Sequence, residues 1–331
     1  MDILTQGLIG AGVSQSVARR EHVVKASLVG FVAGLLADAD VLIRSSSDPL
    51  LSLEYHRHFT HAIFFIPFGA LIAFALLWPL FRKHLSNRHL YLYCLSGFLF
   101  SGFIDACTSY GTHLLWPFSD TRIAWSIISI IDPVFTGILL ITIMIGLKTR
   151  KQVFVRVGIA CCAAYLMLGV MQQQRAETAI HALAQQRGHE IEKIIVKPTI
   201  GNILLWRSVY LDDDRFYIDA ARAGRIVTIF EGDGITRFDP GTMAIDPGST
   251  LANDIARFDH FSDGYVVHYP NRPDVLGDIR YSMTPLGIEP LWGITLYPDK
   301  PDRDVDYRFY RESDKAARQE FIDMLLNRVN N

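Results

Sequence analysis

The chain has 331 residues, of which half are hydrophobic and only 20% are charged, and its mean hydropathy is positive. These values are high for a soluble protein, and the length allows two domains. Residues 1–171 hold 13 Lys and Arg against 9 Asp and Glu, whereas the remaining residues hold 19 against 25. Neither half carries a basic stripe, so nucleic acid is not an expected partner.

Five segments are apolar and long enough to cross a membrane, because a hydrocarbon core about 30 Å thick needs roughly 20 helical residues. These predicted spans are residues 23–43, 60–81, 90–109, 123–147 and 153–171. The N-terminal stretch MDILTQGLIGAGVSQSVARR lacks the basic start and apolar core of a cleaved signal peptide. The four cysteines lie in apolar segments and have neither disulfide nor zinc-finger spacing.

Lysine and arginine are unevenly shared between the loops that join these spans. Ten lie in alternate connections, around residues 19–25, 82–88 and 148–156, and only three lie in the other loops. Because short cytoplasmic loops are rich in Lys and Arg, this bias predicts a cytoplasmic N-terminus. An odd number of spans then predicts that the polar second half of this multi-pass membrane protein is extracytoplasmic.

This topology gathers ionisable side chains on the outer side. Seven of the nine acidic residues of residues 1–171 lie at outer span ends or in outer loops, together with four histidines. They are Asp38, Asp40, Asp48, Glu54, Asp105, Asp120 and Asp132, and His56, His58, His61 and His113. Ionisable groups inside a span are costly, and those near its ends cost less. The gathering of carboxylates and imidazoles on one face therefore predicts a functional site.

Two short motifs carry most of these side chains. In GLLADADVLI, Asp38 and Asp40 point about 200° apart on a regular helix, so both can face one ion only where the helix has ended. A helix end that reaches water is the alternative explanation for Asp40. HRHFTH places three histidines within six residues. If Thr60 caps the second span, His56 can fold back towards His61.

Two later segments contribute further candidates. Asp105 lies inside the third span, with Thr108 and Ser109 on the same helix face. His113 follows the turn that ends this span. Asp132 precedes a proline, which is typical of a helix cap, and it is equally a candidate ligand.

Imidazoles together with carboxylates suit a divalent ion such as Zn²⁺, Mn²⁺ or Fe²⁺ better than Mg²⁺ or Ca²⁺. An ion with an open position activates water and polarises an ester or phosphoryl oxygen. Asp38 is then a candidate general base, and Arg57 is a candidate for holding an anionic oxygen. The expected metal ligands are Asp38, Asp40, His56, His61 and Asp105, with His113 and Asp132 as further candidates.

Four sequence elements occur in a characteristic order. They are DILTQGLIG at residues 2–10, the aspartates of ADAD, HRHFTHA at residues 56–62, and DACTSYGT at residues 105–112 with PFS after it. In these elements the chain resembles the membrane-bound metal-dependent hydrolases of the YdjM/YbcI type over about residues 1–150. The resemblance implies metal binding and hydrolase activity. Gln6 stands where many members have histidine, Ala37 replaces a common proline, and His58 occupies a free position of the motif.

The polar half reads differently. Residues 172–189 continue in helical character as a connector, and residues 190–298 contain short β-branched runs separated by turn sequences such as EGDG and NRPD, which predict strands. SDKAARQEFIDMLLNRV is typical of a closing amphipathic helix capped by Ser313. The predicted fold is therefore a bundle of about five transmembrane helices (1–171), a connector (172–189) and a soluble α+β domain (190–331). No nucleophile elbow, P-loop or dinucleotide motif is present.

Two functions from different classes fit this sequence. The first is a metal-dependent hydrolase of the bacterial inner membrane, with the lipid bilayer as partner and a lipid-like ester or phosphoester as substrate. The alternative is a non-catalytic membrane protein whose metal locks the helix ends together and whose outer domain binds a partner. A transporter is disfavoured because the charged groups gather on one side instead of crossing the membrane.

Overall fold

The computed structural model of the chain describes residues 1–45, 47–243, 245–311 and 315–328. The fold consists of two compact units. The helical unit comprises Met1–Leu42, Tyr55–Met171 and Ile200–Asn202, and the sheet unit comprises Ile43–Glu54, Gln172–Thr199 and Ile203–Asn331. The chain therefore passes between the units more than once.

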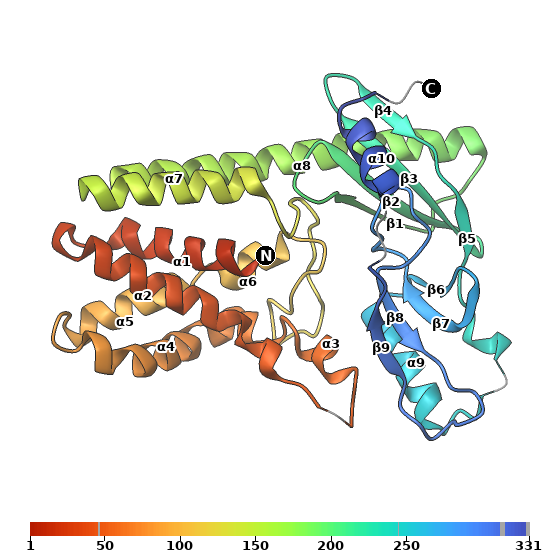
Figure 1. Cartoon of the computed structure of the whole chain (residues 1–331), viewed down its shortest axis with the longest axis horizontal. Helices are drawn as coiled ribbons and strands as arrows, with labels where there is room; N and C mark the ends of the chain where they lie inside the picture. The colour runs from red at the N-terminus through yellow and green to blue at the C-terminus, as the bar shows by residue number, and fades with distance from the viewer. Residues whose placement is uncertain (46, 244, 312–314, 329–331) are drawn as a thin grey trace. The chain divides into compact units, whose positions relative to one another are not determined.

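The body of the helical unit consists of helices that run side by side (Figure 1). The long helices are α1 (Ile3–Val17), α2 (Val23–Leu36), α4 (Ile66–Phe81), α5 (Asn87–Phe98), α7 (Pro133–Thr149) and α8 (Val153–Arg187), which continues into the sheet unit. Short helical segments are η1 (Arg20–His22), η2 (Ala37–Leu42), η3 (Phe59–His61), η4 (Ile63–Phe65) and α6 (Ser101–Ala106). The short helix α3 (Leu51–Tyr55) belongs to the sheet unit except for its last residue.

Helix α1 was not among the predicted spans, yet it packs against α2, α5 and α7. Its small and polar residues are buried against its neighbours, and it needs no continuous apolar surface because other helices enclose it. A Cβ atom added to Gly10 would lie 2.2 Å from the carbonyl oxygen of Gly30 on α2. Such close backbone approach through small residues is typical of helix pairs in membranes.

In the described part of the chain, three helices are long and apolar enough to cross a membrane: Arg20–Leu42, Ile63–Phe81 and Val153–Arg187. The prediction of five continuous spans is not confirmed. Residues 90–109 are divided between α5 and α6, with a break at Leu99 and Phe100. The fourth predicted span begins as a helix only at Pro133, because Asp132 caps α7 and the residues before it are not helical.

The helical unit has two chemically different ends. The α1–α2, α4–α5 and α7–α8 connections share one end, and the N-terminus and α6 lie at the other (Figure 1). These connections and the helix turns beside them contain most of the lysines and arginines of this unit. Met1 and Arg57 contact Asp105 at this second end. The prediction that the N-terminus and the acidic cluster lie at opposite ends is therefore wrong, because α1 adds a helix that hydropathy did not reveal.

The sheet unit contains two antiparallel sheets, which confirms the strand prediction for the polar half. One sheet has the order β1 (Lys193–Pro198), β2 (Leu205–Asp212), β3 (Arg215–Ala223) and β4 (Val227–Phe230), with β5 (Gly234–Thr236) also paired to β3. The other has the order β6 (Val266–Tyr269), β7 (Arg272–Asp278), β8 (Trp292–Thr295) and β9 (Asp306–Phe309).

Helices complete the sheet unit. Helix α9 (Thr250–Phe261) lies in a region predicted to form strands only, and Ser249 caps it by accepting from the Ala252 amide. Its buried face includes Leu251 and Phe258, which join a core with side chains of the second sheet. Helix α10 (Lys315–Leu325) is the predicted closing helix, and its predicted cap, Ser313, lies outside the described residues.

A segment from the first half of the chain completes this core. Leu50 and Leu53 are 1% and 5% exposed and pack with Leu251 and Phe258. Arg257 of α9 forms ion pairs with Asp48 at 2.9 Å and Glu54 at 2.7 Å. Residues 43–54 are therefore part of the sheet unit, although they lie between two elements of the helical unit in sequence.

Candidate metal centre

Three predicted ligands converge at one end of the helical unit. Asp38 lies in η2 directly after α2, His61 ends η3, and Asp105 lies in α6. His61 Nε2 is 3.2 Å from Asp38 Oδ1 and 2.9 Å from Asp105 Oδ2. Ligands about 2 Å from a shared ion are roughly 3 Å from one another, so these separations fit a metal site.

The carboxylates of Asp38 and Asp105 approach His61 Nε2 without meeting hydrogen-bond geometry. His61 Nε2 and Asp38 Oδ1 are buried atoms without a hydrogen-bond partner in the described structure. Unsatisfied buried polar atoms are costly and normally have a partner that explains them. A cation placed between these ligand atoms would satisfy both, so the donor set fits a divalent metal ion.

Asp105 is held from several directions and is fully buried. Its Oδ1 atom contacts Arg57 Nη2 at 3.2 Å and the amino group of Met1. Its Oδ2 atom, which faces His61, accepts a hydrogen bond of 2.7 Å from Gln6 Nε2. Arg57 also donates to Thr108 Oγ1 at 3.2 Å. These contacts fix the carboxylate with one oxygen directed at the ligand set.

Asp40 contacts residues that hold His61 in place and does not belong to the convergent set itself. Its Oδ2 atom accepts hydrogen bonds from the Arg57 amide at 2.7 Å and from Thr60 Oγ1 at 2.8 Å. Its Oδ1 atom lies 3.2 Å from His56 Nδ1, and Thr60 Oγ1 lies 2.9 Å from His61 Nδ1. Such contacts orient a ligating ring and set its tautomer. Asp40 therefore organises the segment that presents His61.

The cluster carries a surplus of negative charge. Burial disfavours a charged imidazole, but the carboxylates of Asp105, Asp38 and Asp40 outweigh this and raise the pKa of His61 to about 10. Three carboxylates face one guanidinium, that of Arg57, and the Met1 amino group. The centre consequently favours one further positive charge, which a proton on His61 supplies or a cation bound at its Nε2 atom would supply instead.

The other predicted residues have different positions. His56 contacts Asp40 and packs at 5.3 Å from the Tyr110 ring, so it is not part of the convergent set. Asp132 caps α7 and accepts a hydrogen bond of 2.9 Å from Tyr165. Arg57, predicted to hold a substrate anion, is 4% exposed and is engaged by Asp105.

His113 also lies outside the convergent set. It belongs to a separate group with His58 and Asp120. Burial lowers the pKa of His113 to about 4, with further contributions from Arg122 and His58, so its ring is neutral at pH 7. Of the predicted ligands, Asp38, His61 and Asp105 therefore share one group and His113 belongs to another. Neither group includes Asp40, His56 or Asp132.

Two residues that support this centre were not predicted as parts of it. Thr60 was expected to cap a helix, and instead it connects Asp40 to His61. Gln6 stands where a histidine was expected from the family pattern, and its side chain reaches Asp105. The position of Gln6 within a motif was the signal that could have placed it at the site.

Comparison with known proteins agrees with the sequence resemblance. Residues 1–176 match the YdjM inner membrane protein family. The uncharacterized protein YfhP of Bacillus subtilis (strain 168) is 27% identical over 243 residues, which cover 72% of this chain and 71% of that protein. No solved structure matches the chain. The family match includes all three convergent ligands and more than half of the residues, and the chain belongs to the YdjM inner membrane protein family.

Proposed function

We propose that this membrane protein is a metal-dependent hydrolase whose divalent ion is held by Asp38, His61 and Asp105. The observation that carries the proposal is the convergence of three ligand atoms, two of which are buried without a hydrogen-bond partner. Zn²⁺, Mn²⁺ or Fe²⁺ suits one imidazole and two carboxylates better than Ca²⁺ does. A divalent ion supplies Lewis-acid chemistry, since it activates water and polarises an ester or phosphoryl oxygen.

The residues of the chain have separate tasks in this proposal. Asp38 is the most accessible of the three ligands, with a side chain that is 14% exposed, so it is the best placed to meet a substrate. A carboxylate in this position can accept a proton from water. Arg57 neutralises Asp105 and keeps it ionised, which is a positioning task.

The substrate class follows from the surroundings of the site. A hollow of about 430 Å³ is lined by Ile63, Phe64, Leu114, Leu115, Trp116, Phe118 and Ser119. The first of these residues, Ile63, follows His61 by two positions in the sequence. Phe118 is 83% exposed and Phe64 is 48% exposed. An apolar hollow beside an apolar helix suits an acyl chain, so a lipid-like ester or phosphoester is the proposed substrate.

The charge distribution gives the proposed orientation. The basic connections share the end opposite to the metal centre (Figure 1). Because short basic loops stay on the cytoplasmic side, the metal centre then faces the outside of the inner membrane. Labelling of single cysteines with a membrane-impermeant reagent in intact cells tests this orientation.

A structural metal site is the second candidate, and one observation favours it. His61 and Asp105 have fully buried side chains, which leaves little room for a substrate at two of the three ligands. In that case the ion joins η2, η3 and α6, and the sheet unit carries the function by binding a partner.

Metal analysis of the full-length protein in detergent tests the metal centre itself. We expect His61→Ala and Asp105→Asn each to lose one bound divalent ion per chain relative to the wild-type protein. His84→Ala is the matched control, because His84 is exposed in the α4–α5 connection. Unchanged ion content in both site variants would contradict the assignment.

A substrate screen separates the two candidates. The purified protein in lipid nanodiscs is offered ester and phosphoester substrates with and without an acyl chain. Turnover that a chelator abolishes, and that Asp38→Asn abolishes while the protein stays folded, supports the hydrolase. Turnover that persists in Asp38→Asn counts against it, and metal binding without any turnover supports the structural site.

A further inference from the structure

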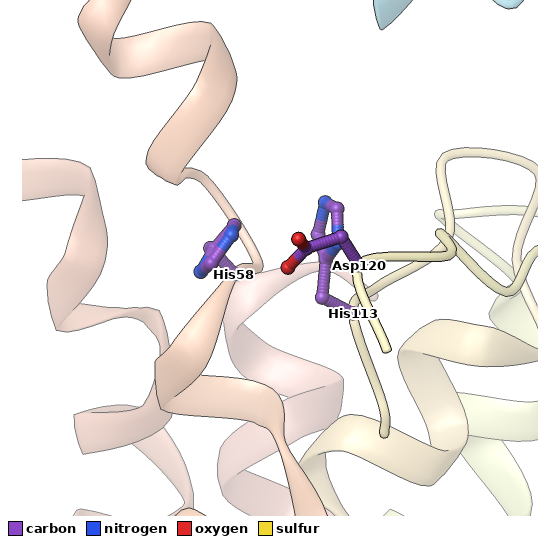
Figure 2. A group of neighbouring side chains, drawn as sticks. All are labelled: His58, His113 and Asp120. Atoms are coloured by element: carbon purple, nitrogen blue, oxygen red, sulfur yellow. The ribbon is translucent and has the colours of Figure 1, made fainter. Parts of the chain in front are cut away.

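A second group of ligand side chains lies in the helical unit and shares no residue with the metal centre. His58, His113 and Asp120 point towards a common space (Figure 2). Their ligand atoms all lie within 4.8 Å of one another, and the rings of His58 and His113 have centroids 4.4 Å apart. The group therefore combines two imidazoles with one carboxylate.

The backbone presents these side chains in a fixed arrangement. Arg57 has a left-handed backbone with φ of 60°, so the chain turns sharply between His56, which faces Asp40, and His58. The carbonyl oxygen of Arg57 accepts hydrogen bonds from the His113 amide at 3.2 Å and from Thr112 Oγ1 at 2.8 Å. The two histidines are thus attached to segments that main-chain hydrogen bonds hold together.

His113 and Asp120 offer polar atoms to a ligand. His113 Nδ1 is buried and has no hydrogen-bond partner in the described structure. Asp120 is exposed. The nearby Arg122 guanidinium is stacked at 4.9 Å over Tyr110 and donates to the carbonyl oxygens of Tyr110 and His56.

Aromatic packing alone does not account for this arrangement. The ring of His58 also lies 5.5 Å from Tyr55 and 5.8 Å from Trp116, as expected for a small aromatic cluster. Packing explains ring contacts, but it does not explain why a carboxylate and a buried, unsatisfied ring nitrogen belong to the same group. Imidazole nitrogens with one carboxylate are a donor set that suits Zn²⁺.

We propose that His58, His113 and Asp120 form a second binding site for a divalent transition-metal ion of the Zn²⁺ class, separate from Asp38, His61 and Asp105. Three protein ligands leave a fourth tetrahedral position for water. The exposed Asp120 makes the ion exchangeable with solvent. The bound ion would fasten the 113–120 turn to the segment that carries Arg57 and His61.

Cobalt spectroscopy of a cysteine variant tests the site directly. The full-length His113→Cys protein is titrated with Co²⁺ in detergent, with the wild-type protein as baseline for the native cysteines. We expect a thiolate-to-cobalt charge-transfer band at one equivalent, because a new sulfur ligand would replace the imidazole. His84→Cys, which puts a thiol in an exposed loop, is expected to give no such band. Equal spectra for the two variants would overturn the proposal.

Stoichiometry separates this site from the metal centre. We expect the wild-type protein to bind two Zn²⁺ ions. His113→Ala or Asp120→Asn should weaken the affinity for one of these ions more than about tenfold, because even the loss of a residue that only supports a ligand lowers metal affinity by that factor. The ion lost in Asp105→Asn is a different one, so Asp105→Asn combined with His113→Ala retains neither. If His113→Ala and Asp120→Asn bind Zn²⁺ like the wild-type protein, the second site does not exist, whatever the outcome at Asp105.

Discussion

Asp132 is a buried carboxylate whose partners explain it without a metal. Its Oδ1 atom accepts from the amides of Val134 and Phe135, and its Oδ2 atom accepts from Tyr165 Oη. These contacts satisfy both oxygens and two of the amides that a helix N-terminus leaves unpaired. The side chain therefore has a structural task at the start of α7.

Substitution of Asp132 separates a cap from a ligand. We expect Asp132→Ala to lower the free energy of unfolding by about 1–2 kcal/mol through the lost cap. Bound divalent metal should stay at the wild-type level, as measured by elemental analysis beside a thermal unfolding curve. Asp132→Asn, which retains a capping oxygen, is the control and should lose less stability. A loss of metal in Asp132→Ala would show that Asp132 is a ligand after all.

The sequence placed Asp38, His61 and Asp105 among its candidate ligands but could not separate them from their neighbours. Residues 37–42 form the 3-10 helix η2, so Asp38 and Asp40 approach different nitrogens of the same ring, His61 Nε2 and His61 Nδ1. The left-handed backbone of Arg57 likewise directs His56 and His58 to different groups. Both features depend on local backbone geometry, which residue spacing does not reveal.

At the scale of elements, glycines set the distance between α1, α2 and α5. A Cβ atom on Gly30 would lie 2.2 Å from Ser14 Oγ and 2.3 Å from the carbonyl oxygen of Gly10, and one on Gly97 would lie 2.7 Å from the Cα of Gly30. Because backbone atoms cannot move aside like a flexible side chain, these three helices can meet only through glycine.

Alanine substitutions at two glycines, one packed and one free of neighbours, test this packing. We expect Gly30→Ala to lower the free energy of unfolding by roughly 3 kcal/mol, the upper part of the usual range for overpacking. Gly137→Ala in α7 is the matched control, since nothing lies within 4 Å of its added Cβ. It should leave stability unchanged or raise it by up to about 1 kcal/mol. Equal melting temperatures for the two variants would contradict the close approach of α1 and α2.

An ion pair joins the end of α8 to the first sheet. Arg187 Nη1 and Nη2 donate to the two carboxylate oxygens of Asp219 at 2.8 and 2.9 Å, and Asp219 has a side chain that is 1% exposed. Arg187 also contacts Glu231, which is 65% exposed. The two acidic partners therefore offer a buried and an exposed contact to the same guanidinium.

Arg187→Leu should destabilise the sheet unit by about 3 kcal/mol, because it leaves the Asp219 carboxylate buried without its cation. Glu231→Gln removes the exposed contact and should cost less than about 1 kcal/mol. Hydrogen exchange of the β3 amides, followed by mass spectrometry, compares the two variants. A larger effect from Glu231→Gln than from Arg187→Leu would reverse this assignment.

The prediction of helices succeeded where apolar residues were continuous. It failed where a helix is held in place by contacts with other parts of the protein and lacks a continuous apolar sequence. Residues 63–81 and, apart from Arg156, residues 153–171 are almost wholly apolar and are helical. Helix α1 has small and polar residues because it is enclosed by protein, so a hydropathy search does not find it. Helix α9 has a strong apolar face, but its short length among predicted strands concealed it.

At the scale of the whole molecule, residues 43–54 connect the units. The stretch SSSDPLLSLE reads as a polar loop, and only the structure shows Leu50 and Leu53 in the core of the sheet unit. Contacts between residues about two hundred positions apart, such as Asp48 with Arg257, cannot be read from local patterns. Domain limits drawn along the sequence therefore miss this segment.

Leu50→Ala tests the membership of this segment. We expect a loss of about 2–5 kcal/mol in the free energy of unfolding of the sheet unit, as for other buried leucines. Faster hydrogen exchange should appear in α9 and β6, far from the substitution in sequence. Leu42→Ala is the control, because Leu42 is 81% exposed. Exchange in α9 that is the same in both variants would show that the segment does not contribute to this core.

Residues 43–54 link the stability of the sheet unit to the positions of Asp40 and His56, which flank this segment in the sequence. Asp40 lies three positions before this segment and His56 two positions after it, and these two side chains contact each other behind His61. Melting of the sheet unit should free the segment and loosen both of its anchors. With the proposed cation bound, thermodynamic linkage would run in both directions: whatever raises the melting temperature of the sheets would delay release of that cation, and loading it would protect the sheets.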